Sequence, residues 1–328
     1  MKRTISVAPM MDCTDRHDRF FLRLISKNVM LYSEMVATKS AIHGDRKKIL
    51  AFSPEEKPLA LQVGGSDKKE LSEVAKIAED IGYDEININL GCPSKKVQKN
   101  KFGACLMKEP NLVSECINEM VNSCNIPVTA KTRIGFDDTE DFDYLNKFIL
   151  KMKEAGCTTF ILHARKAILK GLTPKQNLNI PKLNYEMVYK IKKENPDLEI
   201  IINGGISKIE EIKNHLKLCN GVMIGRAIYQ NPYFLVDVER ELFNVKNHPT
   251  REEVAERLLK YLEKEVKLGT KVNHIMRHAV GLYHGQKGSK NWKRYLSDNM
   301  MARDSDFQKA KHIMTIVQNN EKINQTIA

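Results

Sequence analysis

The residues best suited to chemistry in this 328-residue sequence directly follow short apolar runs. Cys92 is one of them, and it stands between Gly91 and Pro93. Neither neighbour favours a regular helix that would bury the thiol, so the position indicates an acid or a nucleophile rather than a packing cysteine. Lys131 and His163 follow two later apolar runs. A lysine cation stabilises negative charge on an adjacent heterocycle, and a histidine can donate to a carbonyl or phosphate oxygen.

A second group of residues has the composition of a phosphate site. Asn203, Gly204 and Gly205 follow the seventh apolar run, and Gly225 and Arg226 follow the eighth. Exposed backbone N–H groups and a guanidinium after the last two strands of a barrel are typical of phosphate binding. Tight turns that merely require glycine are the alternative explanation.

The elements that must position these residues alternate regularly along the chain. Eight β-rich runs each end at a polar residue or a glycine, and segments of helical period lie between them. Ser66-Asp67 is a good cap for one helix, and Ser207 has capping-box spacing to Glu210 at another. The β-rich runs are residues 5–8, 30–33, 59–63, 85–90, 128–131, 158–162, 198–202 and 221–224, and the helical segments are residues 68–81, 111–124, 140–155, 185–194 and 208–218.

This alternation predicts an α/β fold, a (β/α)8 TIM barrel, over residues 1–245. The polar residues that end the strands would then meet at one rim of the barrel. Polar side chains that end apolar strands are costly unless they have partners, so their convergence indicates a binding site. A doubly wound open sheet is the alternative, but no G-x-G-x-x-G motif follows the first run.

Residues 246–328 differ from the rest of the chain in both pattern and charge. They carry 16 Lys and Arg against 9 Asp and Glu, whereas the first 245 residues carry 37 against 32. A small basic all-α domain is therefore expected after the barrel, with a polyanion such as nucleic acid as its partner. A lysine-rich proteome would explain the charge equally well. The segments of helical period are residues 250–268, 273–283, 290–299 and 304–319.

Cysteine usage and apolar content exclude several classes of protein. The seven cysteines are an odd number and include no C-x-x-C pair, which argues against a disulfide framework and against a zinc site, so no metal is expected. There is no run of 18 apolar residues and no secretory signal at the N-terminus. We therefore expect a cytoplasmic protein that does not enter a membrane.

Motifs along the chain resemble, in order, those of the tRNA-dihydrouridine synthase family. Met11 and Cys13 depart from the motifs of the DusA-type branch of this family, which often has Leu and Trp at these two positions. The motifs shared with the family are residues 6–12, 62–66, 87–94, 131–135, 162–167, 203–206 and 225–227. Those similar to the DusA-type branch, which modifies D-loop positions 20 and 20a, are residues 15–17, 32–36 and 292–297.

The resemblance implies an enzyme that contains FMN and consumes NADPH to reduce uridine to dihydrouridine in the tRNA D-loop. It implies that Cys92 is the proton donor and that no protein partner is obligatory. The residues that it assigns to FMN are Pro9, Met10, Met11, Gln62, Lys131, His163, Asn203, Gly204, Gly205, Gly225 and Arg226. The residues that it places near tRNA are Asn89, Lys95, Arg165, Lys182, Tyr185, Lys293 and Arg294.

The chemistry of uracil agrees with this assignment. Its C5=C6 bond is conjugated to the C4 carbonyl, so hydride transfer from flavin N5 to C6 leaves enolate-like charge that an acid must quench at C5. A thiol serves only while it is protonated, so Cys92 should not be strongly activated by the lysines that follow it. The uridine must also leave its stack, at a cost of about a few kcal/mol that basic residues offset through phosphate contacts.

Three other functions fit parts of the sequence. A flavin barrel could reduce a free enone or pyrimidine, with the basic tail only a solvated surface. Lys131 could form a Schiff base, as in barrel aldolases. An RNA-binding scaffold or chaperone would bind tRNA without needing flavin or residue 92.

Overall fold

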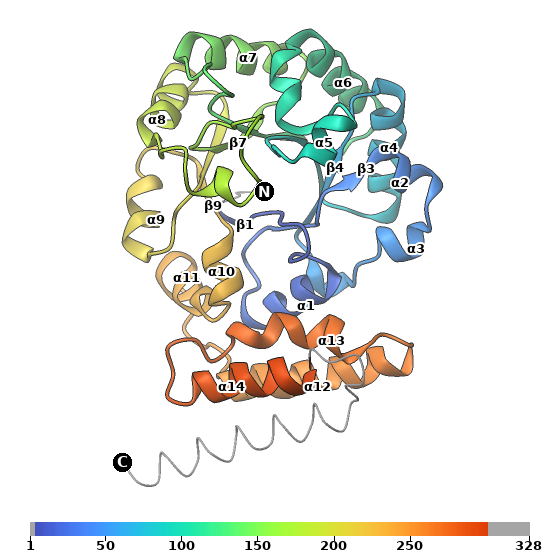
Figure 1. The fold of residues 1–328 in the computed structure, drawn as a ribbon, viewed down its shortest axis with the longest axis vertical. Coiled ribbons are helices and arrows are strands. Elements are labelled where there is room, and N and C mark those ends of the chain that lie inside the picture. Colours follow the sequence, from blue (N-terminus) through green and yellow to red (C-terminus); the bar gives the residue numbers. More distant parts are fainter. Residues whose placement is uncertain (1–3, 301–328) are drawn as a thin grey trace. The chain divides into compact units, whose positions relative to one another are not determined.

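The computed structural model describes residues 4–300 of the chain, and only the backbone of residues 295, 299 and 300. In this part, parallel strands form one sheet in the order β1-β9-β8-β7-β6-β5-β4-β2. A parallel bridge between Ser6 and Met30 joins the two ends of this order. The N–H of Val7 donates to the carbonyl of Met30 (2.9 Å), and the N–H of Met30 donates to that of Ile5 (3.0 Å). The sheet is therefore closed, and the predicted (β/α)8 barrel is confirmed (Figure 1).

The predicted strands are all present, with ends shifted by no more than two residues. A further short strand, β3, was not predicted; it pairs with β4 in register Val36 to Val63, beyond the end of β2. The strands are β1 (Ile5–Val7), β2 (Leu31–Tyr32), β3 (Val36–Ala37), β4 (Leu59–Gly64), β5 (Glu85–Leu90), β6 (Val128–Arg133), β7 (Thr159–His163), β8 (Glu199–Asn203) and β9 (Gly221–Ile224).

Four of the described helices between these strands, α4, α5, α7 and α8, begin at a residue whose side chain accepts from their first N–H groups. Asp67 accepts from the N–H groups of Lys69 (2.9 Å) and Glu70 (3.0 Å), which confirms one predicted cap. The helices are α2 (Thr38–His43), α3 (Arg46–Ile49), η1 (Pro54–Glu56), α4 (Lys68–Ile81), α5 (Lys95–Lys99), η2 (Gly103–Lys108), α6 (Pro110–Ser123), α7 (Phe142–Glu154), η3 (Gln176–Leu178), α8 (Tyr185–Glu194) and α9 (Ile209–His215).

The other predicted cap was wrong by one residue. Helix α9 is capped at Lys208 rather than at Ser207. Glu211 accepts from the N–H groups of both Ser207 (2.8 Å) and Lys208 (3.1 Å). Glu211, not Glu210, is the third residue after the cap, which is the position from which a carboxylate reaches back to these donors.

Contacts within the chain divide it into two compact units. The barrel unit consists of the chain up to residue 12 together with residues 29–225, and the helical unit consists of residues 13–28 and the chain from residue 226 onward. The segment 13–28 therefore leaves the barrel unit between the first two strands. The sequence-based division assigns FMN binding and catalysis to residues 1–245 and tRNA binding to residues 246–328. It remains a prediction, because contacts within the chain do not test which part has which function.

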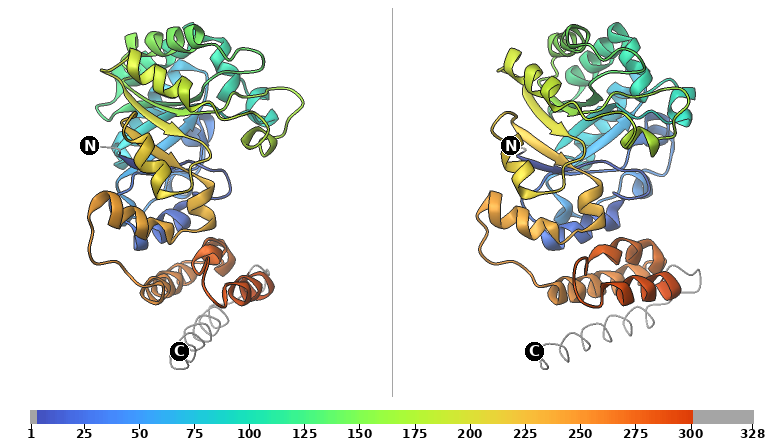
Figure 2. Two further views of the ribbon diagram at one scale, coloured as in Figure 1. Left: turned by 90° about the vertical axis from the view of Figure 1, so that its left-hand side faces the viewer. Right: turned by 60° about the vertical axis from the view of Figure 1, so that its left-hand side comes forward.

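The helical unit is built from the 17-residue helix α12 and shorter helices around an apolar core. Trp292 is buried, its Nε1 donates to the carbonyl of Ala279 (2.9 Å), and its ring meets that of Tyr283 with centroids 5.1 Å apart. The predicted segment 304–319 lies outside the described residues. The elements, visible in two views in Figure 2, are α1 (Arg16–Ile25), α10 (Arg226–Gln230), α11 (Phe234–Phe243), α12 (Arg251–Lys267), α13 (Val272–Met276), η4 (Arg277–Gly281), α14 (Ser289–Tyr295) and η5 (Leu296–Met300).

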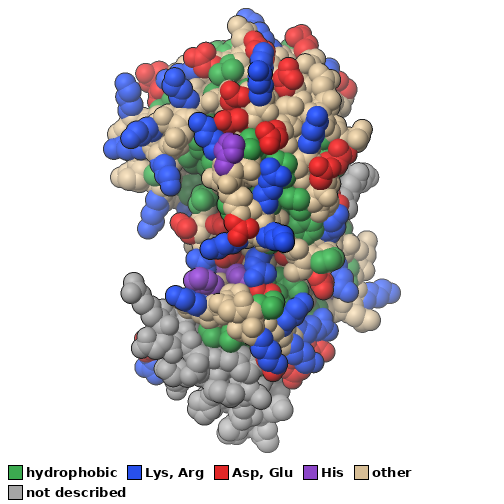
Figure 3. All heavy atoms as spheres, turned by 90° about the vertical axis from the view of Figure 1, so that its right-hand side faces the viewer, with side chains coloured by type: hydrophobic (Ala, Val, Ile, Leu, Met, Phe, Trp, Pro, Cys, Tyr) green, Lys and Arg blue, Asp and Glu red, His purple; other side chains and the backbone are tan. Residues whose placement is uncertain are grey.

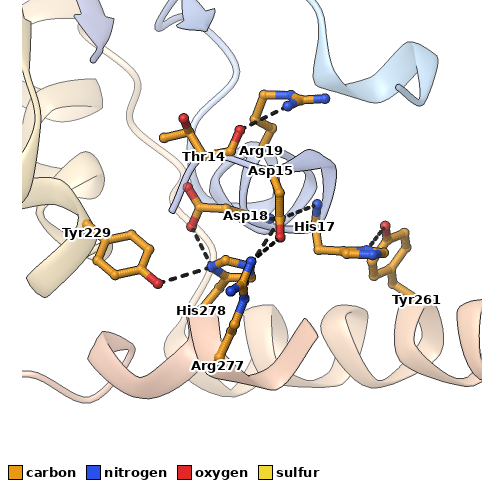
Figure 4. Close-up of polar contacts among 9 residues, drawn as sticks. All are labelled: Thr14, Asp15, His17, Asp18, Arg19, Tyr229, Tyr261, Arg277 and His278. Carbon is orange, nitrogen blue, oxygen red and sulfur yellow. Dashed lines mark hydrogen bonds and ion pairs between the residues drawn. The ribbon is translucent and has the colours of Figure 1, made fainter. Parts of the chain in front are cut away.

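Polar contacts hold α1 within the helical unit. The guanidinium of Arg16 pairs with Glu265 of α12, and the Nδ1 of His17 lies 2.8 Å from the hydroxyl of Tyr261 (Figure 4). At the other end of α1, the buried Glu239 accepts from the N–H groups of residues 27 (2.9 Å) and 28 (3.0 Å). These bonds give partners to the carboxylates of Glu239 and Glu265, which are both buried.

The barrel interior has an apolar side and a polar side. The apolar cluster includes Ala8, Met30, Tyr32, Ala60, Ile161, Ile201 and Met223. The polar side is formed by buried residues of β4, β5 and β6, among them Gln62, Asn87 and Thr129. In residues 4–300, no helix combines the length and the apolarity needed to cross a bilayer.

Candidate functional site

The predicted functional residues of the later strands share one level at the carboxyl ends of the barrel. Strand register pairs Arg133 with His163, and His163 with Asn203. Lys131 lies two residues before Arg133 on β6, so both side chains lie on the same face of the strand. This is the rim at which barrels carry their active sites.

Lys131 is held by the neighbouring strand ends. Its Nζ donates to Oδ1 of Asn203 (3.0 Å), whose Nδ2 donates to the carbonyl of Met223 (2.8 Å). Burial, followed by the charge of Arg133, lowers the pKa of Lys131 to about 7. The site therefore contains a lysine that can exchange a proton near neutral pH.

The turn after β8 requires glycine at two successive positions. Gly204 and Gly205 have φ values of +119° and +74°. A Cβ at Gly204 would lie 3.3 Å from the ring of His163, and one at Gly205 would lie 2.7 Å from Leu183. The positive φ values favour glycine at both positions, a Cβ at Gly205 would clash with Leu183, and a Cβ at Gly204 would be tight against the His163 ring.

Tyr185, predicted to contact tRNA, braces this turn. Its hydroxyl donates to the carbonyl of Gly204 (2.7 Å), and burial raises its pKa. Its ring meets that of His215 edge-on, with centroids 4.6 Å apart, and Nδ1 of His215 lies 2.8 Å from the hydroxyl of Tyr189. The structure therefore connects α8 and α9 to the Gly204 turn, a role that sequence reasoning missed.

The remaining predicted cofactor residues lie at the ends of β1, β4 and β9. A Cβ at Gly225 would lie 3.3 Å from Cβ of Ala8 and from Sδ of Met10, so β1 and β9 meet closely there. Met11 is 54% exposed, which is unusual for a large apolar side chain. Pro9 is half-buried, and Arg226 is exposed at the start of α10 in the helical unit. Gln62, by contrast, is buried inside the barrel.

The backbone of Gly91 and Cys92 is hydrogen-bonded to three neighbouring segments. Oδ1 of Asn89 accepts from the N–H groups of Gly91 (3.1 Å) and Cys92 (2.9 Å). Nε of Arg133 donates to the carbonyl of Gly91 (2.9 Å), and the carbonyl of Cys92 accepts from the N–H of Ala104 (2.9 Å). The Cys92 side chain is half-buried, so the thiol stands on a fixed backbone without being enclosed in the core.

Arg133 was missed as an organising residue. Its Nη1 donates to the carbonyls of Lys166 (3.0 Å) and Asn177 (3.2 Å). It thereby connects the Cys92 loop with the segment after β7, which Figure 2 shows projecting from the barrel unit. The signal was available in the sequence, because Arg133 follows Lys131 at the spacing that places both on one face of a strand.

The other predicted tRNA contacts are spread over both units. Lys95 and Lys182 are exposed in the barrel unit, and Lys293 and Arg294 are exposed on α14. The guanidinium of Arg165 is bonded to the carbonyl of Pro181. Within the barrel unit, Arg165 and Lys182 thus lie on adjoining parts of the segment that follows β7.

One face of the barrel unit carries mixed charge (Figure 3). Elsewhere in the barrel unit, two ion pairs link α4 to α6 and α3: Lys68 with Glu115 (3.0 Å) and Glu73 with Arg46 (3.8 Å). Exposed pairs of this kind contribute little to stability, but they remove the excess of positive charge that a polyanion would need. Charge alone therefore does not mark this face as a tRNA surface.

The chain resembles one solved structure in fold only, and it is much more similar to several proteins in sequence. It superposes on morphinone reductase in complex with tetrahydroNAD with a TM-score of 0.50 and 10% identity, over 77% of this chain and 90% of that one. This likeness supports the barrel fold alone.

Three proteins named tRNA-dihydrouridine(20/20a) synthase match over most of their length. That of Shewanella oneidensis is 50% identical over 300 residues, covering 91% of this chain and 89% of the relative. That of Synechocystis sp. is 49% identical over 298 residues, covering 90% and 89%. That of Escherichia coli (strain K12) is 48% identical over 314 residues, covering 95% and 91%.

The family model described as dihydrouridine synthase (Dus) matches residues 6–320. The match spans the strand ends that carry Cys92, Lys131 and His163 as well as the helices that follow the barrel. The chain is therefore an enzyme of the dihydrouridine synthase family.

Proposed function

We propose that this protein reduces uridine to dihydrouridine at positions 20 and 20a of the tRNA D-loop, with FMN as cofactor and NADPH as reductant. The relatives that share about half of its residues are named for this activity. The observation that carries the proposal is the half-buried thiol of Cys92 on a loop bonded to Arg133, at the rim that also carries Lys131 and His163.

The residues at the rim fit the chemistry of FMN. An isoalloxazine ring presents carbonyl oxygens and ring nitrogens that accept hydrogen bonds, and Lys131 and His163 can donate to them. The Gly204-Gly205 turn and Gly225, followed by Arg226, provide backbone N–H groups and a guanidinium for the phosphate. Because residue 204 is a glycine close to the His163 ring, no side chain covers the backbone of the turn at this point of the rim.

When FMN is bound and reduced, it supplies the hydride that reaches C6 of uracil. The protein's own contribution is the proton for C5. Cys92 donates it from the thiol and is left as a thiolate, which must regain a proton before the next turnover. The loop bonds from Asn89 and Arg133 keep Sγ in place, so that the proton is delivered to one face of the base.

Recognition of tRNA is assigned to the basic residues outside the rim. Lys95 and Lys182 of the barrel unit would bind phosphates near the displaced uridine, and Lys293 and Arg294 of the helical unit would bind other phosphates of the tRNA. Such contacts make affinity fall with salt, with a slope of roughly one unit for each phosphate neutralised. They also offset the cost of taking the uridine out of its stack.

The proposal is tested with the purified FMN-loaded protein, NADPH and an unmodified tRNA transcript that has uridine at both positions. We expect dihydrouridine at positions 20 and 20a and none in a transcript with cytidine there. Product from free uridine at the same rate as from tRNA would overturn the assignment in favour of a small-molecule reductase. A Schiff-base aldolase would be colourless, and borohydride would link it covalently to its substrate through Lys131. A yellow protein that borohydride does not link to substrate therefore excludes that alternative.

The role of Cys92 has its own variant and control. Cys92→Ala should abolish uridine reduction and leave both flavin content and flavin reduction by NADPH intact. Cys105→Ala is the matched control, because Cys105 is also half-buried and burial raises its pKa. Full dihydrouridine formation by Cys92→Ala would refute the assigned role.

A further inference from the structure

A chain of hydrogen bonds runs through the barrel interior from Glu85 to the loop that carries Cys92. Oε1 of Glu85 accepts from the hydroxyls of Thr129 and Tyr32, the latter at 2.8 Å. Oγ1 of Thr129 accepts from Nδ2 of Asn87 (2.8 Å). Oδ1 of Asn87 accepts from Nε2 of Gln62 (2.8 Å).

The chain ends at the Cys92 loop. Oε1 of Gln62 accepts from Nδ2 of Asn89 (2.9 Å). Oδ1 of Asn89 in turn accepts from the N–H groups of Gly91 (3.1 Å) and Cys92 (2.9 Å). Every side chain from Glu85 to Asn89 in this relay is buried, so each bond forms where an unmade one would be costly.

The strand register imposes this arrangement. Gln62, Asn87 and Thr129 are direct partners on one rung across β4, β5 and β6. Glu85, Asn87 and Asn89 alternate along β5, which places all three on the same face. A barrel interior is ordinarily filled by branched apolar side chains, so a polar path across these strands needs a reason other than packing.

The upper end of the relay fixes the direction of every bond. Backbone N–H groups can only donate, so Asn89 must present Oδ1 to Gly91 and Cys92 and its Nδ2 to Gln62. Gln62 must then accept from Asn89 and donate to Asn87. Asn87 in turn must donate to Thr129.

The lower end imposes the same direction independently. When Glu85 is ionised it can only accept, so the single proton of the Thr129 hydroxyl points to Glu85 and its oxygen is left to accept from Asn87. If the Thr129 proton pointed to Asn87 instead, each amide above it would have to turn over. Asn89 would then present its NH2 group to the N–H groups of Gly91 and Cys92, and both bonds to the loop would be lost.

We propose that Thr129 and Glu85 are positioning residues for Cys92. By orienting the amides of Asn87, Gln62 and Asn89, they keep Oδ1 of Asn89 on the two N–H groups of the loop. They touch neither substrate nor thiol. The consequence for turnover rests on the proposed role of Cys92 as proton donor, whereas the consequence for the loop does not.

The test measures the loop directly in the FMN-loaded full-length protein. Thr129→Val removes the hydroxyl with little change of shape, Thr129→Ser restores it, and Thr132→Val makes the same deletion at a buried threonine of β6 whose hydroxyl bonds only to backbone. Amide hydrogen exchange at Gly91 and Cys92 should be about tenfold faster in Thr129→Val, as expected when about one hydrogen bond is lost at each amide. Exchange there should match wild type in the other two variants.

A second readout separates positioning from general destabilisation. In single-turnover experiments, Thr129→Val should slow uridine reduction by about tenfold and leave the reduction of bound flavin by NADPH unchanged. Thr129→Ser, which keeps the hydroxyl, should reduce uridine at the wild-type rate. Unchanged exchange at Gly91 and Cys92 in folded Thr129→Val, or an equal rise in Thr132→Val, would overturn the inference. Faster exchange with an unchanged uridine step would support positioning of the loop and contradict the role of Cys92.

A variant one link nearer to Asn89 covers a failure of Thr129→Val to fold. Asn87→Leu breaks the relay with an apolar side chain of similar size. We expect faster exchange at Gly91 and Cys92 in this variant than in wild type. Wild-type exchange at both amides in folded Asn87→Leu would contradict the relay.

Discussion

Oδ1 of Asp15 lies 3.0 Å from Nε2 of His278, and this pair joins the beginning of α1 to η4 within the helical unit (Figure 4). The same carboxylate accepts from the N–H groups of His17 (2.9 Å) and Asp18 (3.0 Å), so it is also the cap of α1. Nη2 of Arg277 donates to its other oxygen at 2.5 Å. One side chain thus satisfies a helix end and contacts both the Arg277 guanidinium and the His278 imidazole.

Removal of the Asp15 carboxylate should destabilise the helical unit more than the loss of a cap alone. We expect Asp15→Ala to lower the free energy of unfolding by about 2 to 3 kcal/mol, because the cap and the contacts to Arg277 and His278 are lost together. Asp67→Ala, which removes only the cap of α4, should cost about 1 kcal/mol. Denaturant unfolding of both variants measures the difference, and equal losses would show that the contacts to η4 add nothing.

The contribution of Asp15 should also depend on pH. Burial alone would raise its pKa, but the hydrogen bond and charge of His278, together with the bond from Arg277, hold the pKa below its ordinary value. The stabilisation is therefore present above the unfolded-state pKa of about 4 and is lost as the pH falls toward the folded-state value. The difference in unfolding free energy between wild type and Asp15→Asn should accordingly shrink below pH 4. A constant difference would contradict this account.

His17 should make the protein less stable as the pH falls from about 6.5 to 4. Burial, followed by the charge of Arg16, lowers its pKa to about 4, so the unfolded chain binds a proton in this window that the folded protein does not. Each pH unit in the window costs up to about 1.4 kcal/mol from this group. His17→Gln, which cannot titrate, should reduce the slope of unfolding free energy against pH there. His43→Gln is the control, since His43 is exposed.

Lys131 should make flavin binding depend on pH near neutrality. Its pKa of about 7 means that the ammonium is protonated below that pH and neutral above it in the unliganded protein. If the ammonium donates to the flavin ring, affinity should fall as the pH rises through 7, by at most about tenfold per unit. Riboflavin is the suitable probe because it lacks the titrating phosphate. Lys131→Met should bind it more weakly and show no such dependence, and an unchanged profile in this variant would exclude Lys131 as the cause.

Tyr185→Phe should weaken FMN binding, because the phenol braces the Gly204 carbonyl of the turn assigned to the phosphate. The loss of one hydrogen bond predicts a dissociation constant about three to ten times larger by flavin fluorescence. Tyr189→Phe, which loses only its contact with His215, is the matched control. Unchanged FMN affinity combined with weaker tRNA binding would instead support the predicted tRNA contact.

The strands and longer helices were predictable because their signals are local. The runs that became β5 and β9 and the segments that became α4 and α8 have the periods of buried strands and one-sided helices, and the structure reproduces their bounds. Helix α1 was not predicted, although Asp15 is a good cap in front of it. Its partners are in η4 and α12, more than 240 residues away, and no local pattern identifies them.

The amino-acid sequence by itself determined the barrel and the family, and it singled out Cys92, Lys131 and His163, because residue order and strand period place such side chains at one rim. Only the tertiary structure decided which residues hold them. Arg133 and Tyr185 brace the two loops, and Gln62 lies within a buried relay from Glu85 to Asn89. Hydrogen bonds between neighbouring strands depend on register across the barrel, and register is a property of the closed sheet rather than of any one segment.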